Sequence, residues 1–152
     1  KVNHPMIQNL MNDSYLKESP PKSTDINYFG INFLEQSIKN YPQVSGYDFI
    51  RTLVQYTVEC IKYSIEKYVK LNNEDFVLIG SGGGVEHPII VEELVKSGYK
   101  FKMISDYTID SSTKEALLIA VMGACKVLNL ANNMPSATGT GNYIELGDIY
   151  NE

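Results

Sequence analysis

The chain has 152 residues, of which 43% are hydrophobic and 20% charged, the balance of one globular domain or of one lobe of a larger protein. Its formal net charge of −5, with Arg51 as the sole arginine, argues against a nucleic-acid partner, because phosphate contacts need clustered basic side chains. The longest apolar run, residues 116–125, is shorter than the roughly 20 residues of a transmembrane helix, and no signal peptide is recognised, so we expect a cytoplasmic protein with no membrane partner.

Cysteine and histidine usage fits the same compartment. Cys60 and Cys125 both lie in apolar stretches typical of helices, which predicts buried thiols outside disulfides, as in a reducing cytosol. His4 and His87 are the only histidines, and no Cys or His pair has the spacing of metal ligands. No metal site is therefore expected within this chain.

The first third of the chain is predicted to hold short helices with a proline-rich interruption. Ile7, Leu10 and Met11 are spaced for one face of a helix. The prolines of residues 18–24 (ESPPKST) stop any helix there, since proline fixes φ and restricts the residue before it. A second short helix is expected to end before Pro42.

Residues 45–71 carry the clearest helical pattern. Ser45, with Asp48 three residues later, is a start signal, and residues 72–75 (NNED) break the pattern. Tyr56, Tyr63 and Tyr68 lie on or beside this pattern and are expected in the core or at an interface rather than in a site. The predicted buried stripe follows the three-and-four rhythm of a helix and comprises Ile50, Leu53, Val54, Thr57, Val58, Ile61, Ile65, Tyr68 and Val69.

A strand, a helix and a second strand are predicted next. Residues 76–80 (FVLIG) form a short, β-branched apolar run, and residues 99–106 (YKFKMISD) alternate as a strand does. Between them, residues 87–98 predict a helix, with Pro88 at its first position and Gly98 after its end. This order indicates an α/β fold with parallel strands flanked by helices.

The remainder of the chain is predicted to be one helix and a loop-like tail. Residues 111–130 are apolar nearly all round, which predicts a deeply buried helix, and the tail has a short extended piece near residues 143–146. Two strands do not make a stable parallel sheet, because both faces and both edges need cover. We therefore expect further strands from a longer parent protein or from a partner.

The stretch IGSGGGVEHP, residues 79–88, is the main candidate for a binding site. A glycine-rich turn after a strand lets a ligand approach main-chain N–H groups, and the start of the next helix favours anions. The alternative is a tight strand-to-helix turn with no ligand. No lysine follows the glycines as a Walker A loop requires, and the third Rossmann glycine is replaced by Val85, although Asp106 provides an acid about 20 residues on.

Three further motifs are open to two interpretations each. Ser112 and Glu115 have capping-box spacing, so Glu115 either bonds back to its own helix start or faces a ligand hydroxyl. Lys22 either reaches a phosphate or is solvated, and the glycine-rich loop at residues 135–141 has the same ambiguity. No serine has a matching His and Asp pattern, and no carboxylate pair has catalytic spacing.

Four segments together, in this order, resemble the C-terminal part of the anhydro-N-acetylmuramic acid kinases. The resemblance covers nearly the whole chain, and its specificity comes from the order of the motifs, since each alone is weak evidence. The segments are PPKST (residues 20–24), GSGGGVEHP (80–88), SDYTIDSSTKEALLIAVMGA (105–124) and NNMPSATGTGNYIELGDIY (132–150).

The resemblance implies residue roles as well as a fold. The fold is a two-lobed sugar kinase/actin-like one, of which this chain is part of an RNase H-like lobe, with ATP and Mg²⁺ in the cleft between lobes. Glu115 matches a glutamate that looks towards the sugar. The nucleotide-binding residues would be Gly82, Gly83, Gly84, His87 and Pro88. The family commonly has a small residue and then H-N-P, where this chain has Val85, Glu86, His87 and Pro88, so the implied contacts there are those of the backbone.

The resemblance implies an activity that this chain would not complete alone. The family opens the 1,6-anhydro ring of anhydro-N-acetylmuramic acid with water and phosphorylates its 6-hydroxyl from ATP in cell-wall recycling. Its phosphate loop and catalytic aspartate have no counterpart here, so residues 1–152 are expected to be an incomplete C-terminal nucleotide-binding lobe without catalytic residues. The expected partner is a second copy or the missing N-terminal part. A non-catalytic nucleotide-binding or interaction module, and less favourably a Rossmann oxidoreductase, are the alternatives.

Overall fold

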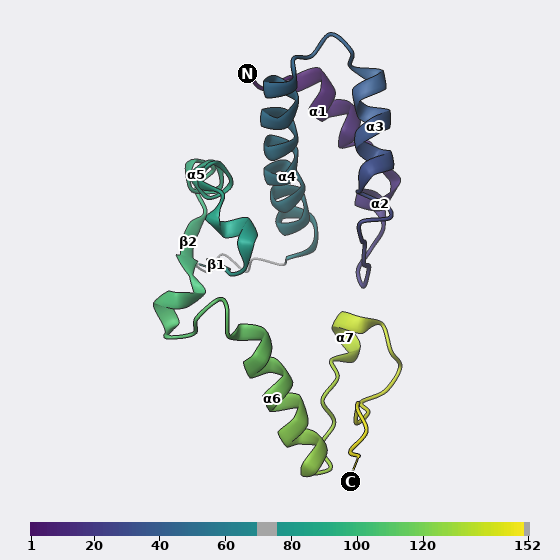
Figure 1. Cartoon of the computed structure of the whole chain (residues 1–152), viewed down its shortest axis with the longest axis vertical. Helices are drawn as coiled ribbons and strands as arrows, with labels where there is room; N and C mark the ends of the chain where they lie inside the picture. Colours follow the sequence, from purple (N-terminus) through teal and green to yellow (C-terminus); the bar gives the residue numbers. More distant parts are fainter. Residues whose placement is uncertain (70–75, 151–152) are drawn as a thin grey trace. The chain divides into compact units, whose positions relative to one another are not determined.

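A computed structural model describes residues 1–69 and 76–150, and the chain divides into two compact units (Figure 1). The first unit comprises Lys1–Ser19 and Ser23–Met103. The second unit comprises Pro20–Lys22 and the chain from Ile104 onward. Residues 72–75, where the helical pattern was predicted to end, lie outside the described residues. The last two positions of the predicted long helix do so as well.

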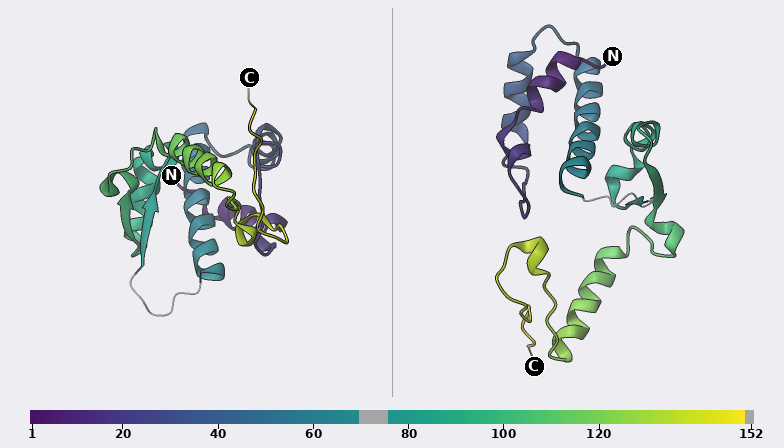
Figure 2. Two further views of the ribbon diagram at one scale, coloured as in Figure 1. Left: turned by 90° about the horizontal axis from the view of Figure 1, so that it is seen from below. Right: turned by 180° about the vertical axis from the view of Figure 1, so that it is seen from behind.

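The N-terminal part of the first unit consists of four helices. They are α1 (His4–Leu10), α2 (Ser14–Lys17), α3 (Ile31–Asn40) and α4 (Gly46–Tyr68). Helix α1 packs against α4, as the views in Figures 1 and 2 show. Met6 of α1 and Val58 of α4 are fully buried, and the Asn3 N–H donates to Thr52 Oγ1 over 2.9 Å. The core of this unit is therefore built on α4.

The predicted start of α4 is confirmed, whereas the helix ends at Tyr68 and its buried residues agree only in part with the predicted stripe. Ser45 is the N-cap, and its hydroxyl accepts from the Asp48 N–H at 3.2 Å. Ile50 is 63% exposed, so its predicted burial was wrong. Helix α4 contacts both α1 and α5, and its buried residues, on opposite sides of the helix, are Phe49, Thr52, Tyr56, Val58 and Ile65.

A parallel strand–helix–strand unit completes the first unit. Strand β1 (Val77–Gly80) pairs with β2 (Lys100–Met103), with Leu78 opposite Phe101 and Gly80 opposite Met103. Between the strands lie a 3₁₀ turn, η1 (Gly83–Glu86), and the α5 helix (Pro88–Lys96). This arrangement confirms the α/β class with parallel strands flanked by helices.

The predicted boundaries of α5 are also confirmed. Pro88 occupies the first turn, where its missing N–H costs nothing. Gly98 has φ of +91°; its N–H donates to the Val95 carbonyl at 2.9 Å, and the Tyr99 N–H donates to the Leu94 carbonyl at 3.3 Å. These two bonds form a Schellman C-cap, which needs a left-handed residue at Gly98.

The second strand is shorter than predicted. It ends at Met103, and residues Ile104–Tyr107 form a 3₁₀ turn, η2, in the second unit. Asp106 therefore lies in a turn and does not end a strand, contrary to the prediction. The acid of the dinucleotide-binding fingerprint is thus absent from the end of β2.

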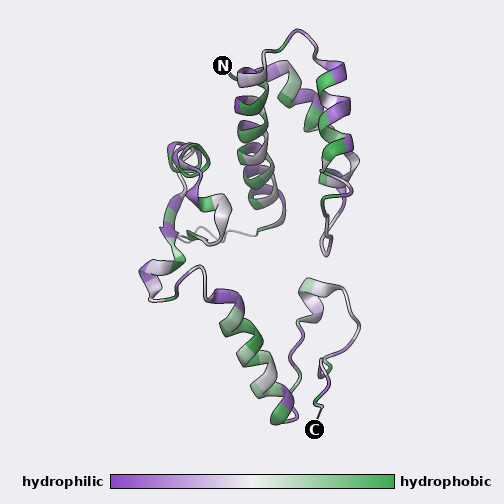
Figure 3. Ribbon diagram, viewed as in Figure 1, coloured by the Kyte–Doolittle hydropathy of each residue, from purple (hydrophilic) through white to green (hydrophobic). Residues whose placement is uncertain are grey.

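The burial predicted for the main helix of the second unit is wrong. Helix α6 (Lys114–Val127) has no buried residue, although Figure 3 colours most of its length as hydrophobic. Leu118 is 58% and Ile119 is 66% exposed. An all-round apolar sequence shows that a helix needs cover on every side, but the described part of this chain does not supply it.

Two adjacent asparagines hold the C-terminal segment in place. Asn132 donates from Nδ2 to the carbonyls of Met122 and Leu146 and accepts at Oδ1 from the Leu146 N–H at 2.7 Å. Asn133 Oδ1 accepts from the Ile144 N–H at 2.8 Å. These side chains bond the predicted extended piece, which is not a strand, and they close the loop around the short α7 helix (Pro135–Thr138).

Candidate functional site

The turn between β1 and α5 begins at a glycine that packing requires. A Cβ on Gly80 would overlap the ring of Phe101 and lie 2.6 Å from Val85 Cγ1. Contacts this short are not tolerated by real side chains, so residue 80 must lack one. This glycine is explained by the fold alone.

Gly82 is required for a different reason, its backbone conformation. Its φ of +87° and ψ of 177° belong to a backbone region that residues other than glycine rarely adopt. No neighbouring atom lies within 4 Å of a Cβ built on Gly82. The conformation, rather than crowding, therefore demands glycine at this position.

Gly83 and Gly84 are explained by neither packing nor conformation. Neither has a positive φ, and a Cβ on either one would have nothing within 4 Å. Both residues are exposed, and within the described chain no acceptor is found for their backbone N–H groups. The tight-turn interpretation accounts for Gly80 and Gly82 but leaves these two bare, unbonded peptide groups unexplained.

Two buried side-chain atoms on either side of the glycines also lack hydrogen-bond partners in the described part of the chain. They are Ser81 Oγ, directly before the glycines, and His87 Nδ1, directly before Pro88. His87 is the N-cap of α5, yet its side chain makes no capping hydrogen bond. Buried polar groups are nearly always paired, so these two atoms mark the turn as a place where a partner is missing. Sequence patterns did not single out Ser81.

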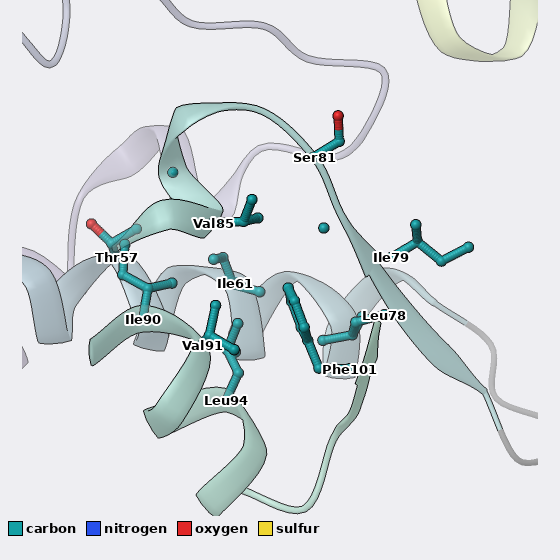
Figure 4. A pocket seen from close by; sticks show the side chains of 12 residues that line it. Thr57, Ile61, Leu78, Ile79, Ser81, Val85, Ile90, Val91, Leu94 and Phe101 are labelled. Carbon is teal, nitrogen blue, oxygen red and sulfur yellow. The ribbon is translucent and has the colours of Figure 1, made fainter. Parts of the chain in front are cut away.

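An apolar hollow of about 320 Å³ lies beneath the turn (Figure 4). Thr57 and Ile61 of α4 line it on one side, and Leu94 of α5 and Phe101 of β2 line it on another. Figure 4 shows Val85 pointing towards this apolar group, while the Ser81 hydroxyl points away from it. The turn therefore has an apolar side, which faces the hollow, and a polar side, which faces away from it.

An ion pair fixes the helix that follows the turn. Arg51 of α4 donates from a guanidinium nitrogen to Glu93 Oε1 of α5 at 3.1 Å, with both side chains about a quarter exposed. Arg51 also donates to Gln55 Oε1 at 3.0 Å. The only arginine of the chain thus connects the two helices that border the turn.

Glu115 is placed in the second unit, whereas the glycine turn belongs to the first. Glu115 is exposed in the first turn of α6, whose N-cap is Thr113. The predicted capping box is wrong, because Ser112 donates both its hydroxyl and its N–H to Asp110 Oδ1 over 2.7 Å. These two bonds hold the pKa of Asp110 below its ordinary value. The carboxylate of Glu115 is therefore not used as a cap by its own helix.

Two motifs without a predicted role meet in the second unit. Residues 20–22 belong to it, and a Cβ on Gly139 would lie 3.1 Å from Pro21 Cγ. Gly139 has φ of +75°, so the loop needs glycine there for its conformation as well. This contact links the PPKST and PSATGTG segments, while Lys22 is placed beside it without an assigned function.

Metal and membrane features are limited in the described residues. Across residues 1–69 and 76–150 there is no group of three or more His, Cys, Asp or Glu side chains that could hold a metal ion. Cys60 and Cys125 are half-buried and form no disulfide. None of the helices in the same ranges combines the length and hydrophobicity that crossing a bilayer requires.

Comparison with known proteins gives a consistent result along the chain. Residues 1–152 match the family described as anhydro-N-acetylmuramic acid kinase. The anhydro-N-acetylmuramic acid kinase of Clostridioides difficile is 34% identical over 98% of this chain and 39% of its own length. That of Francisella tularensis subsp. novicida is 32% identical over 95% of this chain and 38% of its own length. The chain thus spans about two-fifths of the length of these relatives.

Proposed function

The chain belongs to the anhydro-N-acetylmuramic acid kinase family, and from this we propose that it is the C-terminal nucleotide-binding portion of such a kinase. The complete protein would use ATP to open the ring of 1,6-anhydro-N-acetylmuramic acid with water and to phosphorylate the 6-hydroxyl, in the cytoplasm. The sugar kinase/actin-like fold class follows from the family. The Rossmann alternative loses support, since Asp106 does not end a strand.

One observation in the chain itself supports nucleotide binding at the turn. Gly83 and Gly84 carry no side chain although neither space nor conformation forbids one, and their N–H groups have no acceptor in the described chain. Bare, unbonded peptide groups suit close contact with a phosphate or a ribose. In this proposal Gly82 shapes the turn, Gly83 and Gly84 contact the nucleotide, and His87 and Pro88 border it.

The remaining roles are distributed between this chain and parts of the parent outside it. Glu115, exposed and unused as a cap, would face the sugar. Mg²⁺ would enter with the nucleotide phosphates, because the described residues offer no cluster of metal ligands. Ring opening needs a base that activates water, and no residue of this chain is assigned to that step. Residues 1–152 alone are therefore expected to bind nucleotide without turnover.

The test compares Gly83→Val and Gly84→Val with Gly46→Val, in the protein expressed from its complete reading frame. Gly46 is a matched control, since it is exposed, has no positive φ and also has open space around its Cβ. We expect the first two variants to weaken binding of Mg·ATP at least about tenfold in calorimetric titration, because a side chain holds the ligand off the backbone. The Gly46 variant should bind as the parent does.

Three results would count against the proposal. Unchanged affinity for Mg·ATP in the Gly83 and Gly84 variants would remove the turn from the site. Tighter binding of NAD than of ATP would favour an oxidoreductase. ATP binding without ATP consumption when the anhydro sugar is added to the complete protein would leave a non-catalytic nucleotide-binding module.

A further inference from the structure

Ser81 is the polar side chain at the start of the glycine turn, and its hydroxyl makes no hydrogen bond to any described residue. The oxygen is buried and has no partner in the described part of the chain. Two other serine hydroxyls of the first unit are satisfied: Ser64 donates to the Cys60 carbonyl and Ser97 to the Glu93 carbonyl, both over 2.8 Å. An unsatisfied buried hydroxyl destabilises the folded chain, so a binding role would explain why it is present.

Ser81 is followed closely by two backbone N–H groups that have no acceptor in the described residues. The N–H groups of Gly83 and Gly84 point to no acceptor in the described chain, and the Ser81 hydroxyl can donate as well. Consecutive N–H groups in a turn form a concave site for an anion, and a neutral hydroxyl adds a third donor to it. A phosphate suits such a set because its several oxygens are charged acceptors, whereas the acceptors of a ribose or a base are neutral.

We propose that Ser81 is a phosphate-binding residue, which donates its hydroxyl to a phosphate oxygen of the nucleotide beside the Gly83 and Gly84 N–H groups. This inference rests on the proposed function. In the ligand-free chain the Ser81 oxygen is covered, so the nucleotide must displace its cover when it binds. The glycines on its C-terminal side give the turn the freedom to open.

The test is Ser81→Ala, compared with Ser81→Thr and with Ser97→Ala, in the protein from the complete reading frame. Removing an unpartnered buried hydroxyl should leave the melting temperature of the nucleotide-free protein unchanged or raise it. The same change should raise the Kd for Mg·ATP and for AMP about tenfold, because a bond to a charged oxygen is lost. Ser81→Thr retains the donor and should bind within about threefold of the parent.

Ser97→Ala is the matched control, because it removes a satisfied hydroxyl at the far end of α5. It should lower the melting temperature slightly and leave the Kd unchanged. Adenosine, which has no phosphate, should bind Ser81→Ala and the parent equally. A lower melting temperature for nucleotide-free Ser81→Ala would overturn the inference, since the hydroxyl would then be satisfied within the protein.

Three binding outcomes would also overturn the inference, and each identifies what failed. An unchanged Kd for AMP in Ser81→Ala, together with weakened binding in Gly84→Val, would reject Ser81 and retain the nucleotide site. An equal loss for adenosine and AMP would assign the hydroxyl to the nucleoside instead of the phosphate. If neither Ser81→Ala nor Gly84→Val altered ATP binding, the proposed function would fail with the inference.

Discussion

Of the four glycines between residues 80 and 84, two have a structural reason for their identity, and the two reasons differ. A side chain at position 80 would overlap Phe101 and Val85, and Gly82 has a backbone conformation that favours glycine. Gly83 and Gly84 face open space in an ordinary conformation. In one sequence all four look alike, because a glycine's letter does not say whether packing, conformation or a ligand requires it.

Tyr56 shows how burial of a single ionisable group becomes a pH dependence of stability. The residue is 7% exposed in α4, and burial is the first cause that raises the pKa of its phenol above the ordinary value of 10.0. Below pH 10 both the folded and the unfolded states hold this phenol neutral, so its contribution to stability is fully present. Above pH 10 the unfolded state ionises first, and that contribution is lost as the pH rises.

We therefore expect Tyr56→Phe to reduce the alkaline loss of stability. Between pH 10 and pH 11 the free energy of unfolding of the parent should fall by up to about 1.4 kcal/mol more than that of the variant. Urea unfolding at a series of pH values measures the difference. Tyr47→Phe is the matched control on the same helix, since Tyr47 is 91% exposed. Parallel pH profiles for the parent and Tyr56→Phe would contradict the prediction.

At the scale of elements, α5 and α6 have similar apolar sequences and different surroundings. Helix α5 packs on α4 and β2 and buries Leu94, which is 3% exposed. Helix α6 buries none of its residues in the described chain. Periodicity predicted both helices correctly, but it could not say which one finds a neighbour, because packing partners come from distant parts of the sequence.

This difference predicts unequal costs for one type of substitution. Leu94→Ala should lower the free energy of unfolding by about 2 to 4 kcal/mol, since it removes a core side chain and leaves a cavity. Leu118→Ala should cost less than about 1 kcal/mol, because Leu118 is 58% exposed. Urea unfolding followed by the amide signals of each helix, at low protein concentration, makes the comparison. Equal costs would show that α6 is covered in solution.

Most predicted helix ends are confirmed, whereas one predicted helix cap does not form. Ser45, Pro88 and Gly98 take the predicted positions at helix ends. The capping box of Ser112 with Glu115 does not form, because the nearby Asp110 carboxylate accepts both Ser112 donors. Ser112 could form a capping box with Glu115 or hydrogen-bond to Asp110, and the spacing of the residues alone does not show which arrangement is more stable.

At the scale of the whole molecule, a large amount of apolar surface is left open. Ile79 of β1 is 55% exposed on a sheet of two strands, and Leu118 and Ile119 are exposed on α6. Exposed apolar patches of this kind mark interaction surfaces or aggregation sites. A second copy, or another part of the parent protein, remains our proposal for what covers them.

We expect residues 1–152 expressed alone to associate as their concentration rises. Sedimentation velocity should show a weight-average mass that increases with concentration, and Ile119→Lys should reduce this increase by placing a charge on the α6 surface. Tyr47→Lys, at a still more exposed position in the first unit, is the control. A monodisperse monomer at every concentration would contradict the prediction.

The sequence by itself determined the α/β order, the parallel strands and most helix ends, because these depend on residues close together in the chain, and it indicated the family through the order of four motifs along the chain. Only the tertiary structure decided which apolar residues are covered, where Asp106 lies, and that Ser81 and two of the glycines lack a structural reason for their identity. Burial and hydrogen-bond satisfaction depend on contacts between distant segments, and such contacts do not leave a local pattern in the chain.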